Sequence, residues 1–155
     1  VGAGMISDRA VDSERKLAAW EASESDAPTS SSGEVKFVTS EERAARFGQK
    51  AATVLITGLT GTGKSSVAFG LERKLFDNGR AAIVVDGDRM RQGMNRDLGY
   101  SVEDRSENLR RSAFTAKLIN DNGLFCIASF VAPSQAIRER VAETIGQGRM
   151  LTVYL

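Results

Sequence analysis

The sequence predicts an α/β fold with a doubly wound, mainly parallel sheet and helices on both faces. Three observations support this prediction. Short apolar runs alternate with amphipathic stretches from residue 53 onward, and each run has the length of a buried strand. A loop, Gly58-Leu59-Thr60-Gly61-Thr62-Gly63-Lys64-Ser65, joins the first run to the next stretch and has the spacing G-x-x-x-x-G-K-[ST].

The individual elements are predicted from periodicity and from start and stop signals. Ser40, with Glu41 and Glu42 after it, resembles a capped helix start, and Asn78-Gly79 and Gly123 end two later helices. The expected helices cover residues 40–47, 64–78, 105–122 and a stretch that Ser134 caps; the expected strands cover 53–57, 81–85, 124–130 and 150–155.

Apolar spacing predicts which side chains face the core. On the helix at 64–78 we expect Val67, Leu71 and Leu75 to form one stripe. The run at 81–85 is typical of a strand buried on both faces. The remaining inward positions are Leu109, Ala113 and Ala116 on one helix and Ile137, Val141 and Ile145 on another. No helix follows the last strand, so we expect the sheet to lack its C-terminal part.

Composition changes along the chain and separates two regions. Residues 7–40 are polar and serine-rich and are expected to form a linker, with a short helix at 15–22 that places Leu17 and Trp20 on one side. Residues 41–155 form the expected P-loop domain. The start at Val1, without a basic and apolar leader, suits a cytoplasmic fragment of a longer protein.

Charge and residue usage restrict the chemistry. The chain has 155 residues, a net charge of +1 and no apolar run long enough for a membrane span, which argues against nucleic acid and membrane partners. It contains no histidine, so catalysis must use carboxylates, Lys, Arg and a metal ion. The one cysteine, Cys126, lies in an apolar run and is expected to be buried.

The glycine-rich loop predicts a nucleoside triphosphate site. Its amides can surround a phosphate at the positive end of a helix dipole. Lys64 would reach the β- and γ-phosphates, and the Ser65 hydroxyl would hold Mg²⁺. The alternative is a glycine-rich turn that binds nothing.

A second group, Asp86-Gly87-Asp88, directly follows a predicted strand. Ligands of open parallel sheets bind beyond the carboxyl ends of the strands, where the glycine-rich loop also lies. These carboxylates could position Mg²⁺ and accept a proton from an attacking hydroxyl. The alternative is a solvated Asp-Gly turn. An Arg-rich stretch follows, and its guanidinium groups suit an anionic acceptor or a solvated helix face.

Several blocks together resemble the adenylylsulfate (APS) kinase family. They are the loop from Gly58 to Ser66, the run 86–95, the run 97–101, the run 104–111 and Ser129-Phe130-Val131-Ala132-Pro133. The resemblance covers about residues 51–155. It implies a P-loop kinase that transfers a phosphoryl group from MgATP to the 3′-hydroxyl of adenosine 5′-phosphosulfate, giving 3′-phosphoadenosine 5′-phosphosulfate (PAPS) and ADP.

The resemblance also implies site residues. It places Gly61, Thr62, Gly63, Lys64, Ser65 and Ser66 on ATP, and Asp88, Arg89, Met90, Arg91, Tyr100, Arg105, Asn108, Val131 and Ala132 around APS. Lys64, Asp86 and Asp88 are the expected catalytic residues, with Ser65 and Asp86 on the metal. Arg91 and Arg105 would neutralise the phosphosulfate, and Tyr100 would stack on the adenine. The sequence does not decide whether Asp86 or Asp88 is the base.

Two positions depart from the family pattern. Arg89 stands where the family usually has Asn, and Ala132 stands where many members have a serine that can be phosphorylated. A silent nucleotide-binding module and a gluconate- or shikimate-type kinase are the alternatives to an APS kinase.

Residues 1–6 are similar to the end of the GTPase-like large subunit of bacterial sulfate adenylyltransferase. We therefore expect the C-terminal kinase part of a bifunctional enzyme, fused to that subunit and associated with its small subunit. A homodimer is expected as well.

Overall fold

The computed structural model describes residues 37–155, and residues 38–155 form one compact unit. The described residues contain a parallel four-stranded sheet with the order β2-β3-β1-β4. Its strands are β1 (Thr53–Thr57), β2 (Ala82–Asp86), β3 (Phe125–Phe130) and β4 (Met150–Tyr154). The predicted parallel α/β sheet is thus confirmed. The predictions for residues 1–6, for most of the linker and for a helix at 15–22 lie outside the described residues.

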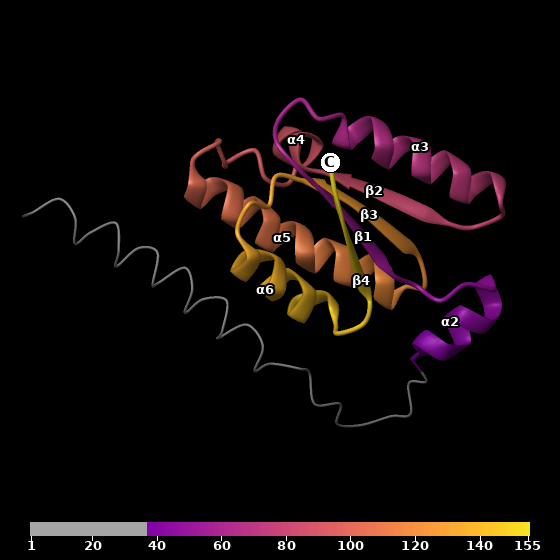
Figure 1. Cartoon of the computed structure of the whole chain (residues 1–155). Coiled ribbons are helices and arrows are strands. Elements are labelled where there is room, and N and C mark those ends of the chain that lie inside the picture. Colours follow the sequence, from indigo (N-terminus) through magenta and orange to yellow (C-terminus); the bar gives the residue numbers. More distant parts are fainter. Residues whose placement is uncertain (1–36) are drawn as a thin grey trace, which may run out of the picture. The chain divides into compact units, whose positions relative to one another are not determined.

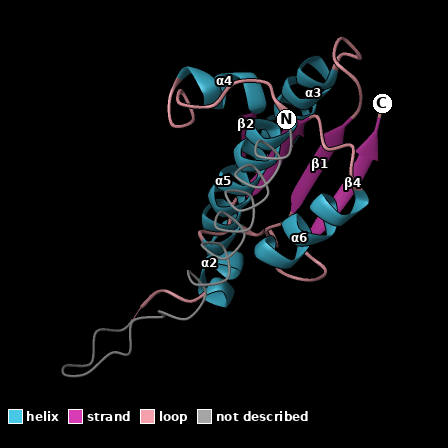
Figure 2. Ribbon diagram, turned by 90° about the vertical axis from the view of Figure 1, so that its left-hand side faces the viewer, coloured by secondary structure: helices cyan, strands magenta, loops and turns pink. Residues whose placement is uncertain are grey.

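Helices cover both faces of this sheet. Helix α3 (Lys64–Asp77) packs on one face, and α5 (Val102–Asp121) and α6 (Gln135–Ile145) pack on the other (Figure 1). Helix α2 (Ser40–Phe47) precedes β1, and the short α4 (Gly87–Gln92) follows β2 directly. Figure 2 shows α4 beside α3 at one end of the sheet. Within residues 37–155, no helix is both long and apolar enough to cross a membrane.

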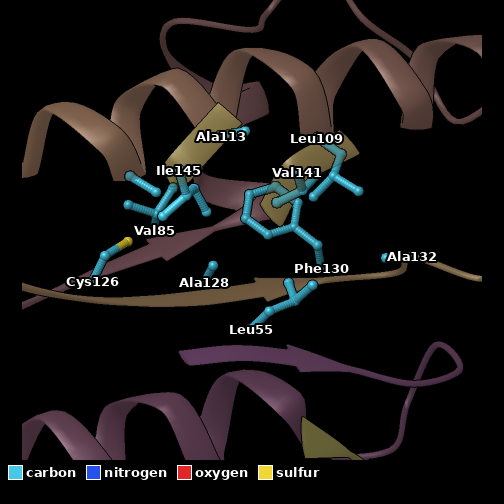
Figure 3. Close-up of a cluster of buried hydrophobic side chains, with 11 residues drawn as sticks. Leu55, Val85, Leu109, Ala113, Cys126, Ala128, Phe130, Ala132, Val141 and Ile145 are labelled. Atoms are coloured by element: carbon cyan, nitrogen blue, oxygen red, sulfur yellow. The ribbon is translucent and has the colours of Figure 1, made fainter. Parts of the chain in front are cut away.

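Two apolar clusters fill the space between the sheet and its helices. On the side of α5 and α6, one cluster contains Leu55, Cys126 and Phe130 of the strands and Leu109 and Val141 of the helices (Figure 3). On the side of α3, Ile56, Ala68 and Ile127 form a smaller cluster. Neighbouring strand residues therefore alternate between the two clusters, as the period of a strand requires. Cys126 is fully buried, as predicted.

Several element boundaries and faces differ from prediction. Thr39, and not Ser40, caps α2: its hydroxyl accepts from the Glu42 amide, and the Glu42 carboxylate accepts from the Thr39 amide. Helix α5 begins at Val102, where Ser101 caps it. On α3 the predicted stripe is wrong at Val67, which is exposed, because the small Ala68 is the residue that lets the helix approach the sheet.

The prediction that the second strand is buried on both faces is also wrong. Strand β2 is at the edge of the sheet, and Ile83 remains 40% exposed. An apolar run shows that a segment is a strand, but it does not show the position of that strand in the sheet.

Candidate active site

The phosphate loop connects β1 to α3 and leaves the start of that helix open. Gly61 and Gly63 have φ values of 86° and 84°, in the left-handed region that favours glycine. Gly63 is the N-cap residue of α3 and supplies no side-chain hydrogen bond, and the first turn contains no acidic residue. The first amides of α3 are therefore available to an anion such as a phosphate.

Lys64 lies across this loop. Its ammonium group donates to the Leu59 carbonyl at 2.5 Å, and the Thr62 hydroxyl donates to the same carbonyl at 2.9 Å. The loop thus holds the Lys64 charge next to the open amides of α3. Both features favour binding of a polyphosphate.

Asp86 connects the phosphate loop to the end of β2. Its Oδ2 accepts from the Ser65 hydroxyl at 2.6 Å. Its Oδ1 accepts from the amides of Asp88 at 3.1 Å and Arg89 at 3.3 Å, so Asp86 is also the N-cap of α4. The buried Asp86 carboxylate thereby fixes two parts of the site. It holds Ser65 in the first turn of α3, and it sets the direction in which α4 leaves the sheet.

These contacts keep the Asp86 carboxyl ionised. Burial raises its pKa, but hydrogen bonds from Ser65, from the amides of Arg89 and Asp88 and from Ser129 outweigh burial, and the pKa lies below its ordinary value. Ser129 lies beside Asp86 in the register of β2 and β3. A hydroxyl next to an ionised carboxylate is a suitable pair of oxygen ligands for Mg²⁺. This ion usually takes one or two ligands from the protein and fills its other positions with water and phosphate oxygens. Among the described residues, no group of three or more His, Cys, Asp and Glu could hold a metal.

A cationic and aromatic group lies on the other side of the site. The guanidinium carbons of Arg91 and Arg105 lie 4.5 and 5.6 Å from the centroid of the Tyr100 ring. Arg91 also donates to the carbonyls of Gly87 and Gly99, and Arg105 donates to the carbonyl of Tyr100. The two guanidinium groups are therefore held in place by backbone acceptors.

The phosphate loop and the cationic group border one cavity of about 510 Å³. Its lining contains most of the residues that the sequence predicted: Gly61, Gly63, Lys64, Ser65, Ser66, Asp86, Asp88, Arg91, Tyr100, Arg105, Asn108 and Val131. Residues whose contribution the sequence did not indicate complete it: Thr60, Gly87, Ser129 and Phe130. A cavity of this size can hold a nucleotide-sized ligand.

Four predicted residues do not line this cavity. The Arg89 guanidinium lies over the Phe69 ring at 4.7 Å, and Met90 packs against the larger apolar cluster. The Ala132 amide donates to the Thr57 hydroxyl at 3.0 Å, so Ala132 fixes the loop that carries Val131. The Thr62 hydroxyl is directed to the loop's own carbonyl.

Ser129 is the site residue that sequence reasoning missed most clearly. The sequence indicates it only as part of an apolar strand and of a block that resembles the family. A polar side chain near the carboxyl end of a parallel strand, next in register to the strand that ends in Asp86, was the available signal.

The parallel sheet and its phosphate loop together define the P-loop kinase fold class. A model of the adenylylsulphate kinase family matches residues 50–155. The chain is 43% identical, over 118 residues, to an adenylyl-sulfate kinase of Shewanella amazonensis, with 76% of this chain and 60% of the relative covered. This chain belongs to the adenylylsulphate kinase family.

Two further comparisons are more specific. The bifunctional enzyme CysN/CysC of Rhodopirellula baltica is 54% identical over all 155 residues, which are 24% of its length. The Mycobacterium tuberculosis APS kinase CysC, solved in complex with AMPPNP and APS, superposes with a TM-score of 0.63 at 41% identity, covering 68% of this chain and 62% of that one. The chain thus spans less than two thirds of these proteins.

Proposed function

We propose that this chain transfers the γ-phosphoryl group of ATP to the 3′-hydroxyl of adenosine 5′-phosphosulfate, forming PAPS and ADP. One observation carries the proposal: a single cavity joins the phosphate loop and the Ser65–Asp86 pair to the Arg91, Tyr100 and Arg105 group. A phosphate donor and an anionic aromatic acceptor therefore have binding surfaces that face the same space. The likeness to an APS kinase solved with both kinds of ligand supports this proposal.

On the donor side, the open amides of α3 and the Lys64 ammonium bind and neutralise the phosphates. Ser65 and Asp86 would hold Mg²⁺, which would supply positive charge to offset that of the phosphates. Gly61, Thr62, Gly63 and Ser66 belong to the same ATP site.

On the acceptor side, Arg91 and Arg105 bind the phosphosulfate, and the exposed ring of Tyr100 stacks on the adenine. Of Asp86 and Asp88, Asp88 is the better base, because its side chain is 73% exposed and its ion pair with Arg91 is long, at 3.5 Å. Asp88 takes the proton of the 3′-hydroxyl as the new O–P bond forms and the bond to the leaving ADP oxygen breaks.

We further propose that the parent protein is bifunctional and makes APS in a preceding sulfate adenylyltransferase part. The 54% identity to CysN/CysC supports this, since that match includes residues 1–49, which precede the kinase family match. Association with a small subunit, a homodimer and a cytoplasmic location stay predictions.

The test uses the full-length protein in a coupled assay of ADP release. We expect APS to stimulate ADP release strongly and gluconate and shikimate to leave the basal rate unchanged. Arg91→Ala and Arg105→Ala should raise KM for APS at least tenfold more than KM for ATP, since a lost charge-assisted bond costs about 1.5–3 kcal/mol. Equal effects on both substrates would show that these residues do not face the acceptor.

A further inference from the structure

Two buried asparagines lie behind the acceptor side of the cavity. Asn95 is in the loop between α4 and α5 and is fully buried, and Asn108 is on α5 and is 1% exposed. The Asn95 amide nitrogen donates to Asn108 Oδ1 at 2.6 Å. Of this pair only Asn108 lines the cavity.

The Asn108 amide has one orientation that satisfies its neighbours. Its Oδ1 accepts from Asn95, and its Nδ2 donates to the Gly87 carbonyl at 3.3 Å. After a flip, Asn108 Oδ1 would face the Gly87 carbonyl and Nδ2 would face the Asn95 amide nitrogen. Each of these contacts would place like groups together. If the Asn95 amide turned as well, its Oδ1 would accept from Asn108 Nδ2, but Asn108 Oδ1 would still face the Gly87 carbonyl and Asn95 Nδ2 would lose its acceptor. The flipped state is therefore disfavoured in both cases.

The same Gly87 carbonyl accepts from Arg91 Nη1 at 3.1 Å. The direction of the Asn108 amide is thus coupled to the position of the guanidinium group beside Tyr100. Asn108 Nδ2 has two hydrogens, and only one of them is used on Gly87. The second is the donor that Asn108 can offer to a ligand in the cavity.

The buried Asn95 side chain holds the Asn108 amide in this direction, but its burial lowers the stability of the folded protein. Its Oδ1 is buried and has no hydrogen-bond partner within the part of the chain that the structure describes. Its other hydrogen bonds are made by its backbone: the Asn95 amide donates to the Met90 carbonyl at 2.8 Å, and the Asn95 carbonyl accepts from the Leu98 amide at 3.0 Å. A buried acceptor left unpaired is unfavourable, so stability alone does not account for this side chain.

We propose that Asn95 is a positioning residue: it fixes the Asn108 amide so that an N–H, and not a carbonyl oxygen, faces the acceptor. The proposal rests on the proposed function. It makes the site selective for a phosphoryl-accepting substrate that has a hydrogen-bond-accepting oxygen or nitrogen atom at that position. Asn95 itself does not touch the acceptor.

The test compares Asn95→Ser, Asn108→Ala and the double variant in the full-length protein. We expect Asn95→Ser and Asn108→Ala each to raise KM for APS about tenfold, the equivalent of one aligned hydrogen bond, with KM for ATP within about twofold. The double variant should match Asn108→Ala alone, because Asn95 acts only through Asn108.

Asn120→Ser is the matched control. Asn120 is equally buried, lies at the other end of α5 and bonds to Thr53 and Leu124, away from the cavity. The Asn120→Ser variant should have a lower melting temperature and unchanged KM values for APS and ATP. Asn95→Asp is the second variant, because its carboxylate only accepts. It forces the Asn108 amide to flip and should weaken APS more than Asn95→Ser does.

The outcomes are distinguishable. Wild-type turnover of APS is measured first, and a wild type that does not use APS overturns the proposed function and this inference together. A wild type that uses APS, with an Asn95→Ser variant that changes both KM values equally or adds fully to Asn108→Ala, overturns only the inference.

Discussion

Replacement of Asp86 can separate two functions of one carboxylate. Asp86 caps α4 through the amides of Asp88 and Arg89, and it accepts from Ser65 at 2.6 Å. Asn is as good an N-cap as Asp, so Asp86→Asn keeps the cap and loses the charge. Asp86→Ala loses both.

The expected magnitudes follow from these contacts. Asp86→Ala removes a cap, at about 1 kcal/mol, and leaves donors around a buried site unpaired, so we expect a total loss of about 2–4 kcal/mol. Asp86→Asn keeps the cap and should cost about 1 kcal/mol, the net contribution of one hydrogen bond. Both variants lose a metal ligand and should lower kcat about 10²- to 10³-fold, as removal of one charge-stabilising group does.

The dependence of stability on acidic pH gives a further check of the Asp86 assignment. The folded-state pKa of Asp86 lies below its ordinary value, so its contribution is present above the unfolded pKa of about 4 and is lost as pH falls through the folded pKa. Wild-type protein should therefore lose more stability than Asp86→Asn between about pH 5 and the folded pKa.

The assays are thermal unfolding from pH 3 to 7 and ADP release at varied Mg²⁺. Ser65→Ala is the matched control, since it removes the hydroxyl of the pair and keeps the cap. An Asp86→Asn variant with wild-type turnover and an unchanged Mg²⁺ requirement would refute the assignment of Asp86 to the metal. An Asp86→Ala variant with an unchanged melting temperature would refute its role as a cap.

Three further predictions test other parts of the molecule. Lys64→Ala should lower kcat by a factor equivalent to about 3–4 kcal/mol, measured by ADP release; near-wild-type turnover would contradict the assignment of the loop. Burial raises the pKa of the Cys126 thiol to about 12, so a thiol reagent at pH 8 should label the native protein only at its unfolding rate, and fast labelling would show an open core. Gly87→Ala should cost about 1–3 kcal/mol in chemical denaturation, because the new Cβ would lie 3.0 Å from Phe130 Cδ1; an unchanged midpoint would mean that α4 shifts freely.

The sequence predicted the parts of the site that depend on local spacing. The phosphate loop has its ligand groups within eight residues, and Asp86 follows an apolar run, so the sequence alone places both on the same edge of the sheet. The structure confirms that edge by the Ser65–Asp86 hydrogen bond.

The parts that depend on distant segments could not be predicted in this way. Helix α4 is six residues long and has no apolar period, and it exists because Asp86 caps it and Gly87 packs against Phe130. The pairing of Asn95 with Asn108 needs the fold of the loop between α4 and α5. The positions of Arg89 and Ala132 outside the cavity lining likewise depend on tertiary contacts with Phe69 and Thr57.

The strand order has a consequence for the folding of this protein during its synthesis on the ribosome. Strand β1 carries the phosphate loop, but its neighbours are β3 and β4, and β2 contacts β1 only through β3. Thr53 lies beside Cys126 in the register, far along the chain. A nascent chain that has emerged only as far as α5 holds every residue of the phosphate loop and the Asp86 carboxylate, yet it has no strand to bring them together. Nucleotide binding during synthesis should therefore begin abruptly once β3 has left the exit tunnel.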